Sequence, residues 1–189
     1  MSIKGTITTT DYIDFDIVMN TATNLLGDKK KRMYAMYMIV AVNTGLRIGD
    51  ILTLTFEQLE SDTLVLIEEK TSKRREIRIN DAIRKALSTY TPKEKKGCIF
   101  VSQKGTTVSR QRINVVLKEV FKNKRSCEGL NISSHSLRKS FGRRVYDSNG
   151  RSHEALAKLS EILNHSDTKV TRRYLGLRKQ EIQSVYMNL

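Results

Sequence analysis

The stretch MYAMYMIVAVNTGLRIGDIL, residues 33–52, decides the fold. Up to Asn43 it is apolar on every side of a helix, a pattern typical of a helix buried in a protein core. Gly45 follows as a stop signal, because glycine readily takes the left-handed conformation that ends many helices. Helical spacing of apolar residues then resumes and places Arg47 and Asp50 three residues apart on one side. The stretch therefore predicts a buried helix followed by a second helix that carries both polar residues.

Further helices are predicted on both sides of this stretch. An amphipathic helix runs from Phe15 to Leu26 and ends at Gly27-Asp28. The other helical segments are Asp81 to Tyr90, Ser109 to Lys122, Ser134 to Asp147, Ser152 to Leu163, and a C-terminal stretch from Arg178.

A different pattern runs from Thr63 to Asn80. Two segments, TLVLIEE and EIRIN, are rich in β-branched residues and flank the polar connection KTSKRR. This arrangement predicts a β-hairpin, and we expect residues 98–101 to add a short third strand. The fold class is thus α+β, mostly helical, with a small antiparallel sheet against a helical core.

Composition sets limits on the class of protein. With 39% hydrophobic and 29% charged residues, the 189-residue chain matches a globular domain, not a disordered segment. The longest apolar run has ten residues, whereas a bilayer-spanning helix needs about twenty. No secretory signal starts the chain, and the two cysteines lack the spacing of a metal site. We expect a single cytoplasmic domain without a bound metal.

The net charge of +14 points to a polyanion as partner. Such a charge concentrates nucleic acids near the protein surface and accelerates their capture. Charge alone does not distinguish an enzyme that acts on nucleic acid from a protein that only binds it. Specific residues must decide between these classes.

Five short segments carry residue types suited to phosphoryl chemistry. Taken singly each is weak, because 34 basic residues and seven tyrosines occur in the chain. Their order along the chain is TGLRIGD with Arg47, EEKTSK with Lys70, SSHSLRKS with His135 and Arg138, ILNHSD with His165, and TRRYLG with Tyr174.

These segments resemble the motifs of the tyrosine recombinases, also called phage-type integrases. In that family a helical T-G-x-R is followed by a hairpin lysine, by H-x-x-R, and by L-x-H with a tyrosine nine residues after the histidine. His165 and Tyr174 are nine residues apart here. The resemblance extends from about Thr10 to the end. It implies that residues 1–189 are a single catalytic domain without the family's N-terminal core-binding domain.

The resemblance implies a role for each residue, and chemistry explains the residue types. Tyr174 would be the nucleophile, because its ester with a DNA 3′-phosphate conserves the energy of the broken bond. The attacked phosphate gains negative charge on its non-bridging oxygens, which guanidinium groups match in shape. Arg47 and Arg138 would bind these oxygens, with His165 as a third donor.

The remaining site residues act on protons or on geometry. Lys70 would donate a proton to the departing 5′ oxygen, with Lys73 as its competitor. His135, three residues before Arg138, would be a base or hydrogen-bond partner near the tyrosine oxygen. Asp50 would orient its neighbours without reacting.

The implied partner is double-stranded DNA, and no cofactor is implied. We expect DNA contacts from six basic residues: Lys73, Arg74, Arg75, Lys139, Arg172 and Arg173. The chain would be a monomer in isolation and a tetramer on two DNA sites, associated with the nucleoid. An apolar stripe at helical spacing, Ile182, Val185, Tyr186 and Leu189, would dock on a neighbouring protomer in that assembly.

Two other hypotheses about the function stay open at this point. Residues 155–175 also resemble a helix-turn-helix, which would make the chain a non-catalytic DNA-binding protein. A type IB topoisomerase uses the same reacting groups but relaxes supercoils. The sequence departs from the recombinase pattern at Asn164, where glycine is common, and in a long interval between Arg138 and His165.

Overall fold

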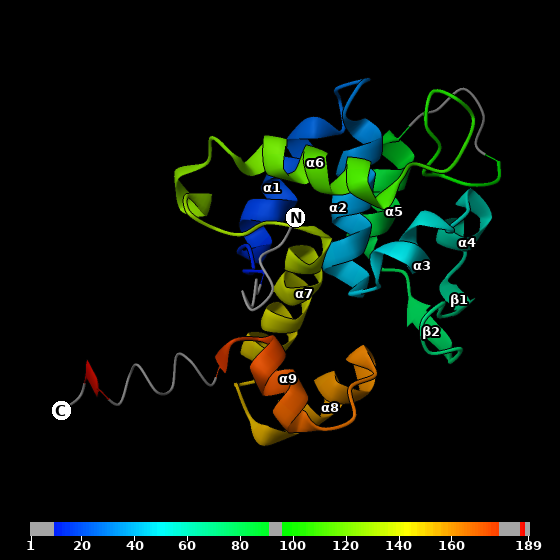
Figure 1. Ribbon diagram of the computed structural model, residues 1–189. Helices are drawn as coiled ribbons and strands as arrows, with labels where there is room; N and C mark the ends of the chain where they lie inside the picture. Colours follow the sequence, from blue (N-terminus) through cyan, green and yellow to red (C-terminus); the bar gives the residue numbers. More distant parts are fainter. Residues whose placement is uncertain (1–9, 91–95, 178–185, 188–189) are drawn as a thin grey trace.

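The computed structural model describes residues 10–90, 96–177 and 186–187 (Figure 1). Its elements are α1 (Phe15–Leu25), α2 (Arg32–Thr44), α3 (Ile48–Leu52), α4 (Phe56–Glu60), β1 (Thr63–Ile67), β2 (Arg74–Arg78), α5 (Asp81–Thr89), α6 (Arg110–Phe121), a 3-10 turn η1 (Arg125–Cys127), α7 (Ser134–Ser148), α8 (His153–Leu163) and α9 (Thr168–Tyr174). The predicted C-terminal stretch from Arg178 lies outside the described residues, apart from positions 186 and 187.

Helix α2 is the centre of the molecule, as its apolar sequence predicted. Every residue from Ala35 to Val42 is buried. Helices α1, α5 and α7 all pack against it. The helix ends at Gly45, whose φ of 61° is the left-handed conformation expected of a glycine stop. Residue 47 follows at once, so the core helix sets the position of the first predicted catalytic arginine.

Side-chain caps explain why the helices begin where they do. Each cap is an Asp, Asn or Ser whose oxygen accepts a hydrogen bond from a backbone N–H of the first turn. The capping residues are Asp14 for α1, Asn80 for α5, Ser109 for α6, Ser152 for α8 and Asp167 for α9. The predicted starts of these helices are confirmed to within a residue or two, except for α9, whose helix was anticipated only as part of a helix-turn-helix.

The predicted hairpin is confirmed, but its third strand is not. β1 and β2 are antiparallel, with Thr63 opposite Arg78 at one end, and they form a two-stranded sheet. The segment at residues 98–101 instead meets the chain just before α4, where the Ile99 N–H donates to the carbonyl of Leu54. Ile99 and Phe100 are buried in the helical core. Burial of these side chains thus decided the partner of this segment.

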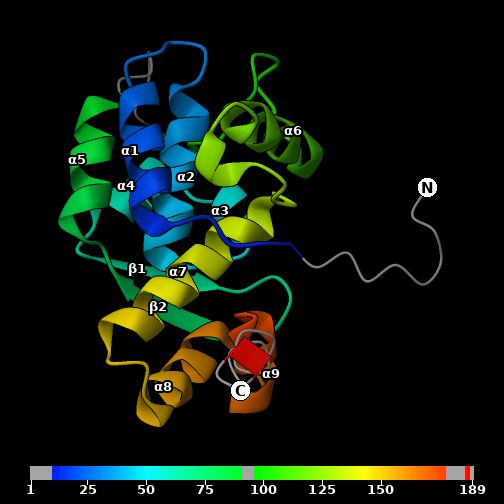
Figure 2. The same cartoon turned by 90° about the vertical axis from the view of Figure 1, so that its left-hand side faces the viewer.

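Helix α7 connects two hydrophobic clusters. The larger surrounds α2, and the smaller lies between the end of α7, α8 and α9. In Figures 1 and 2, α7 runs from the large helical group toward α8 and α9. The second cluster includes Leu156, Leu159, Leu163 and Leu175, with Tyr174 packed against it. The chain segments that carry the predicted site therefore meet along α7.

No helix in the described part of the chain is both long and apolar enough to cross a membrane.

Candidate active site

Arg138 ties together segments that are far apart in the sequence. It points from α7 into the interior and is only 4% exposed. Its guanidinium donates one hydrogen bond to the carbonyl of Gly45 and another, of 2.8 Å, to the carbonyl of Leu163. The glycine belongs to the first motif and Leu163 ends α8, next to the histidine motif. Arg138 is therefore held between the two segments that carry Arg47 and His165.

Arg47 approaches the same carbonyl. It precedes α3, and its Nη2 lies 3.5 Å from the Leu163 carbonyl oxygen. Its Nη1 donates to Glu68 at 2.8 Å. The side chain is 20% exposed. The two predicted phosphate-binding arginines thus converge on one carbonyl at the end of α8, and Arg47 remains accessible from solvent.

His165 and Tyr174 lie side by side in the structure. Their ring centroids are 5.2 Å apart with an interplanar angle of 72°. The Nδ1 of His165 is 2.9 Å from the hydroxyl oxygen of Thr171, a buried residue of α9. The ammonium group of Lys139 lies 5.4 Å from the centroid of the tyrosine ring. The nine-residue spacing thus corresponds to a turn and a short helix that return the tyrosine to the histidine.

The tyrosine hydroxyl is buried, and no partner in the described structure meets the geometry of a full hydrogen bond to it. Burial raises the pKa of Tyr174 to about 12, even though the positive charges of Arg138 and Arg47 favour the phenolate. The tyrosine is therefore neutral at physiological pH. To attack a phosphate it needs a group that accepts its proton.

The charged groups of the site also change each other's pKa values. Burial, and then the neighbouring Arg47, lower the pKa of Arg138 to about 10, so it stays cationic at neutral pH. The pKa values of His135 and His165 fall below the usual value because of burial and the surrounding positive charges. Lys70 is one of the charges that act on His135. Both imidazoles are thus neutral near pH 7, and a neutral imidazole can accept a proton or a hydrogen bond.

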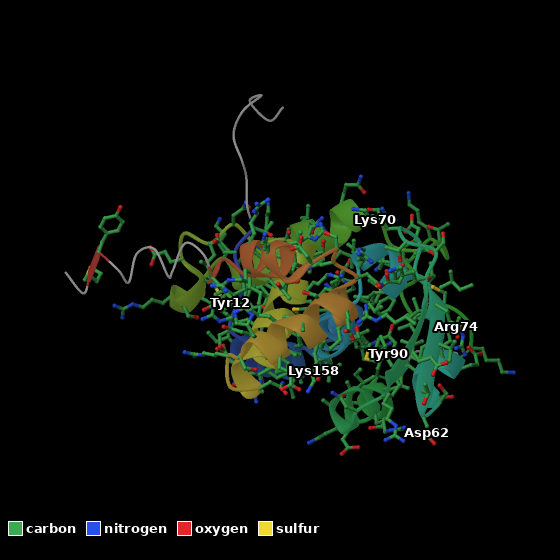
Figure 3. All side chains as sticks on the ribbon, turned by 90° about the horizontal axis from the view of Figure 1, so that it is seen from below. Tyr12, Asp62, Lys70, Arg74, Tyr90 and Lys158 are labelled. Carbon is green, nitrogen blue, oxygen red and sulfur yellow. The ribbon has the colours of Figure 1, made fainter. Side chains whose placement is uncertain are left out.

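Lys70 lies on the exposed turn between β1 and β2 (Figure 3). Contacts of Glu69, the residue before Lys70, hold the turn in place. The Glu69 N–H donates to Asp50 at 2.8 Å, and the Glu69 carboxylate pairs with Arg110 at 2.6 Å. Lys73 is exposed on the same turn. The positive charge of Lys70 helps to lower the pKa of His135, which favours Lys70 as a residue of the site.

Asp50 contacts the hairpin through its carboxylate. Its side chain is buried and accepts from the backbone of the lysine turn. The carboxylate that pairs with Arg47 is Glu68, which the sequence reasoning missed. Alternation along β1 could have found it, because Leu64, Leu66 and Glu68 share one face of the strand and Leu64 is buried.

The six predicted DNA contacts differ in exposure. Lys73, Arg74 and Arg173 are exposed and suited to phosphate contact. Arg75 points inward instead: its side chain is 11% exposed and donates to Glu68 and to the Thr44 carbonyl. The prediction of Arg75 as a DNA contact is therefore replaced by a structural role, since its donors are used inside the protein.

The other two predicted contacts are partly buried. Lys139 donates to the carbonyl of Thr10 at 2.6 Å. Arg172 lies on α9 and is half-buried. Within the described ranges, no three His, Cys, Asp or Glu side chains form a group that could hold a metal ion.

Gly45 is needed for the site as well as for the fold. An added Cβ would overlap the ring of Phe141, and the positive φ disfavours any other residue. We expect Gly45→Ala to lower the free energy of unfolding by about 2 kcal/mol or more, from strain and overpacking together. Urea unfolding of Gly105→Ala is the matched control, because that glycine has a φ of 77° but nothing within 4 Å of its added Cβ. Equal losses in the two variants would contradict the role of Phe141.

Comparison with known proteins places this geometry in context. Residues 14–181 match the model of the phage integrase family. The protein named "Probable integrase/recombinase YoeC" from Bacillus subtilis (strain 168) is 32% identical over 162 residues, which cover 84% of this chain and 85% of that protein. Tyrosine recombinase XerC from Pseudomonas fluorescens (strain Pf-5) is 32% identical over 148 residues, covering 75% of this chain and 47% of XerC. The chain spans about half the length of the XerC relatives it matches.

Solved structures share the fold. A XerH site-specific recombinase bound to palindromic difH substrate superposes with a TM-score of 0.70 at 19% identity, covering 95% of this chain and 53% of the XerH chain. The XerA recombinase gives a TM-score of 0.67 at 18% identity, covering 97% of this chain and 66% of XerA. The predicted α+β catalytic fold is thereby confirmed. The non-catalytic helix-turn-helix interpretation gains no support, because the matching family model and the named relatives are those of integrases and recombinases.

Proposed function

Since this chain belongs to the phage integrase family, the tyrosine recombinases that cut and rejoin DNA strands, we propose that it is a site-specific DNA recombinase with Tyr174 as its nucleophile. One observation carries the assignment of the residues. Arg47 and Arg138 converge on the Leu163 carbonyl, two residues before the histidine whose ring lies against Tyr174. The four residues come from separate motifs and form one polar site.

In the proposed reaction, the Tyr174 oxygen attacks a DNA phosphorus. A bond forms between that oxygen and phosphorus, the bond to the 5′ oxygen breaks, and the 3′ end remains as a phosphotyrosine. Arg47, Arg138 and His165 stabilise the charge that develops on the non-bridging oxygens, and each such donor contributes about a hundred- to a thousandfold in rate. Attack by a 5′ hydroxyl on the phosphotyrosine reverses these bond changes and rejoins the strand.

Two protons move in this reaction. The tyrosine proton needs an acceptor, and neutral His135, at the start of α7, is the proposed one. The departing 5′ oxygen needs a donor, and Lys70 on the exposed turn is the proposed one. In this scheme the proton donor reaches the reaction from the hairpin, while the nucleophile comes from α9.

A chelator experiment tests the proposed function. Nicked duplexes carrying randomised sequence are incubated with the chain, and covalently captured DNA is recovered under denaturing conditions. We expect capture to be the same in EDTA and in Mg²⁺, because arginines and a lysine supply the charge and the proton that a metal supplies in other nucleases. Capture that is lost in EDTA and restored by Mg²⁺ would contradict the proposal, as would no capture in either condition.

The proposed substrate is double-stranded DNA, and the proposed assembly is a tetramer on two DNA sites. The chain's charge of +14 and the exposed basic residues of the hairpin and α9 support DNA binding. Integration, excision and inversion all use the same cleavage and rejoining steps, so the arrangement of the two sites would determine the product.

The C-terminal stripe is proposed to join neighbouring protomers in this assembly. Of its residues only Tyr186 is described, and it is 74% exposed. Deleting residues 182–189 should spare DNA binding by the monomer and weaken assembly on paired sites, as gel-shift experiments would show. Gln183→Ala, a change off the apolar stripe, is the control. A truncated chain that assembles like the intact one would rule out docking between protomers.

A further inference from the structure

Glu68 is an ionised carboxylate in a fully buried position. Its residue is 0% exposed, although it lies at the end of β1 next to the solvent-exposed lysine turn. Placing a charge in the interior is costly unless the charge is paired and hydrogen-bonded. A single unpaired glutamate could not remain there. Its partners therefore show what this carboxylate does.

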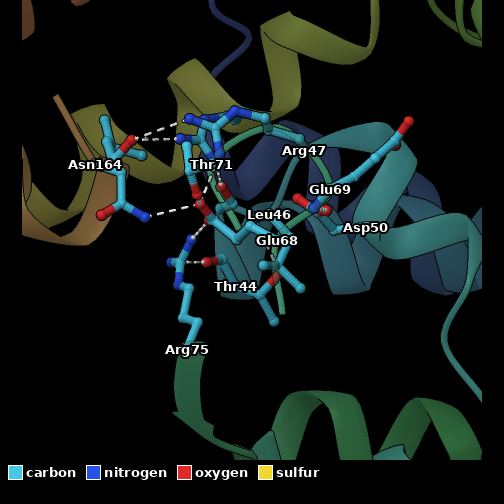
Figure 4. Close-up of polar contacts among 12 residues, drawn as sticks. Thr44, Leu46, Arg47, Asp50, Glu68, Glu69, Thr71, Arg75 and Asn164 are labelled. Carbon is cyan, nitrogen blue, oxygen red and sulfur yellow. Dashed lines mark hydrogen bonds and ion pairs between the residues drawn. The ribbon is translucent and has the colours of Figure 1, made fainter. Parts of the chain in front are cut away.

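Four donors from four parts of the chain meet Glu68 (Figure 4). Oε2 accepts from Arg47 at 2.8 Å, from the Thr71 hydroxyl at 2.8 Å and from the Asn164 amide at 2.7 Å. Oε1 accepts from Arg75 at 3.0 Å. Arg47 immediately precedes α3, and Thr71 lies on the lysine turn. Asn164 caps the end of α8, and Arg75 lies on β2. One carboxylate thus joins the segment of Arg47, the hairpin with its lysine turn, and the end of α8.

The bonds outweigh the cost of burial. Burial by itself would raise the pKa of Glu68, but the hydrogen bonds from Thr71, Arg75, Asn164 and Arg47 lower it to about 2. The carboxylate therefore stays charged throughout the neutral range. It also offsets the repulsion between Arg47 and Arg75, each of which pairs with one of its oxygens.

Asn164 adds a connection that a glycine could not provide. Its φ of 53° is the left-handed conformation, which glycine adopts with less strain. The asparagine amide reaches from the end of α8 to Glu68 across 96 positions of sequence. Its side chain thereby connects the turn before His165 to the hairpin that carries the lysine.

We propose that Glu68 is a positioning residue, which holds Arg47 and the Lys70 turn in register with the α8–α9 segment through its hydrogen bonds to Thr71 and Asn164. The inference rests on the proposed function for its catalytic meaning. Glu68 is too deeply buried to touch DNA, so it acts only through these neighbours. It would set the distance between the proton donor on the hairpin and the nucleophile on α9.

Single-turnover cleavage of the captured duplex tests this role. We expect Glu68→Gln to lower the maximal cleavage rate by about tenfold or more, the usual effect of losing a residue that supports reacting groups. The dissociation constant for DNA should change by less than about twofold, since no phosphate contact is removed. Glu60→Gln, an exposed carboxylate on α4, is the matched control and should cleave like the original chain.

A second substrate separates positioning of Lys70 from general damage to the fold. In a duplex with sulfur in place of the bridging 5′ oxygen, the leaving thiolate departs without a proton donor. The defects of Lys70→Ala and Glu68→Gln should both shrink on this substrate. A Glu68→Gln defect that is equal on both substrates would overturn the assignment of the lysine turn to Glu68.

Hydrogen exchange of the free protein decides the matter without DNA. In Glu68→Gln the amides of residues 69–73 should exchange on the order of tenfold faster, because the charge-assisted hydrogen bond that Thr71 donates to the carboxylate is lost. If Glu68→Gln does not fold, Thr71→Val and Asn164→Gly each remove one donor and leave the carboxylate in place. Exchange and cleavage unchanged in both variants would refute the proposal. Failure of the original chain to capture DNA would refute the proposed function alone, and the exchange result would still decide whether Glu68 anchors the turn.

Discussion

Tyr174→Phe should form no covalent adduct with DNA, while its DNA affinity stays within about twofold of the original chain. The substitution removes one oxygen, and that oxygen is the atom that becomes bonded to phosphorus. The ring would keep its packing against His165 and the small hydrophobic cluster. Denaturing gel electrophoresis of the captured duplex measures the adduct, and a filter-binding titration measures the affinity.

Tyr146→Phe is the control for this prediction. Tyr146 belongs to the same hydrophobic cluster and is 9% exposed, but it lies on α7 and is not one of the predicted site residues. This variant should form the adduct at the original rate. An adduct that persists in Tyr174→Phe and disappears in Tyr146→Phe would show that the nucleophile has been misassigned.

Replacing Arg138 should produce the second large effect. Arg138→Lys keeps a positive charge but cannot span the carbonyls of Gly45 and Leu163 as the guanidinium does. We expect the cleavage rate to fall by about a hundred- to a thousandfold, the usual effect of removing one preorganised donor from a developing anion. Single-turnover cleavage at saturating protein measures this effect separately from DNA affinity.

The same substitution at Arg144 is the matched control. Arg144 lies on the same helix and contacts the ring of Phe15, with its guanidinium carbon 5.1 Å from the ring centroid. Arg144→Lys should leave cleavage close to that of the original chain. If the two variants lose activity equally, the effect comes from α7 in general, and Arg138 has no special role in binding the phosphate.

Much of the fold follows from periodicity, since helices bury one face at regular spacing. The central helix shows the signal at its strongest, because its apolar residues leave no alternative to burial. The third strand shows the limit of such reasoning. Residues 98–101 have the composition of a strand, but only tertiary packing decides which backbone they pair with.

The site residues, like the fold, could be predicted only in part from the sequence. Arg47, Arg138, His165 and Tyr174 were identified by spacing and resemblance, and the structure brings them together. The supporting contacts were not foreseen. In the sequence, Glu68 is one of many charged residues near a predicted turn. Only the folded chain shows that four donors converge on it.

The prediction that Arg75 contacts DNA missed its inward position for a related reason. A run of basic residues suggests an exposed surface, yet alternation along β2 turns every second side chain away from solvent. Arg74 and Arg75 are neighbours with opposite environments, one exposed and one buried against Glu68. Charge composition alone could not separate them.

The hydrogen bond between Arg138 and Leu163 also predicts where the chain accepts extra residues. The two residues are 25 positions apart, and the exposed loop at residues 149–152 lies between them. Extra residues in that loop would lengthen a solvent-facing excursion and leave both ends of the bond in place. A single residue inserted between Leu163 and His165 would rotate the histidine away from the carbonyl that aligns both arginines. We therefore expect that an epitope or a fluorophore can be grafted near Gly150 to follow the protein during recombination, whereas the same addition at the end of α8 should disrupt the site.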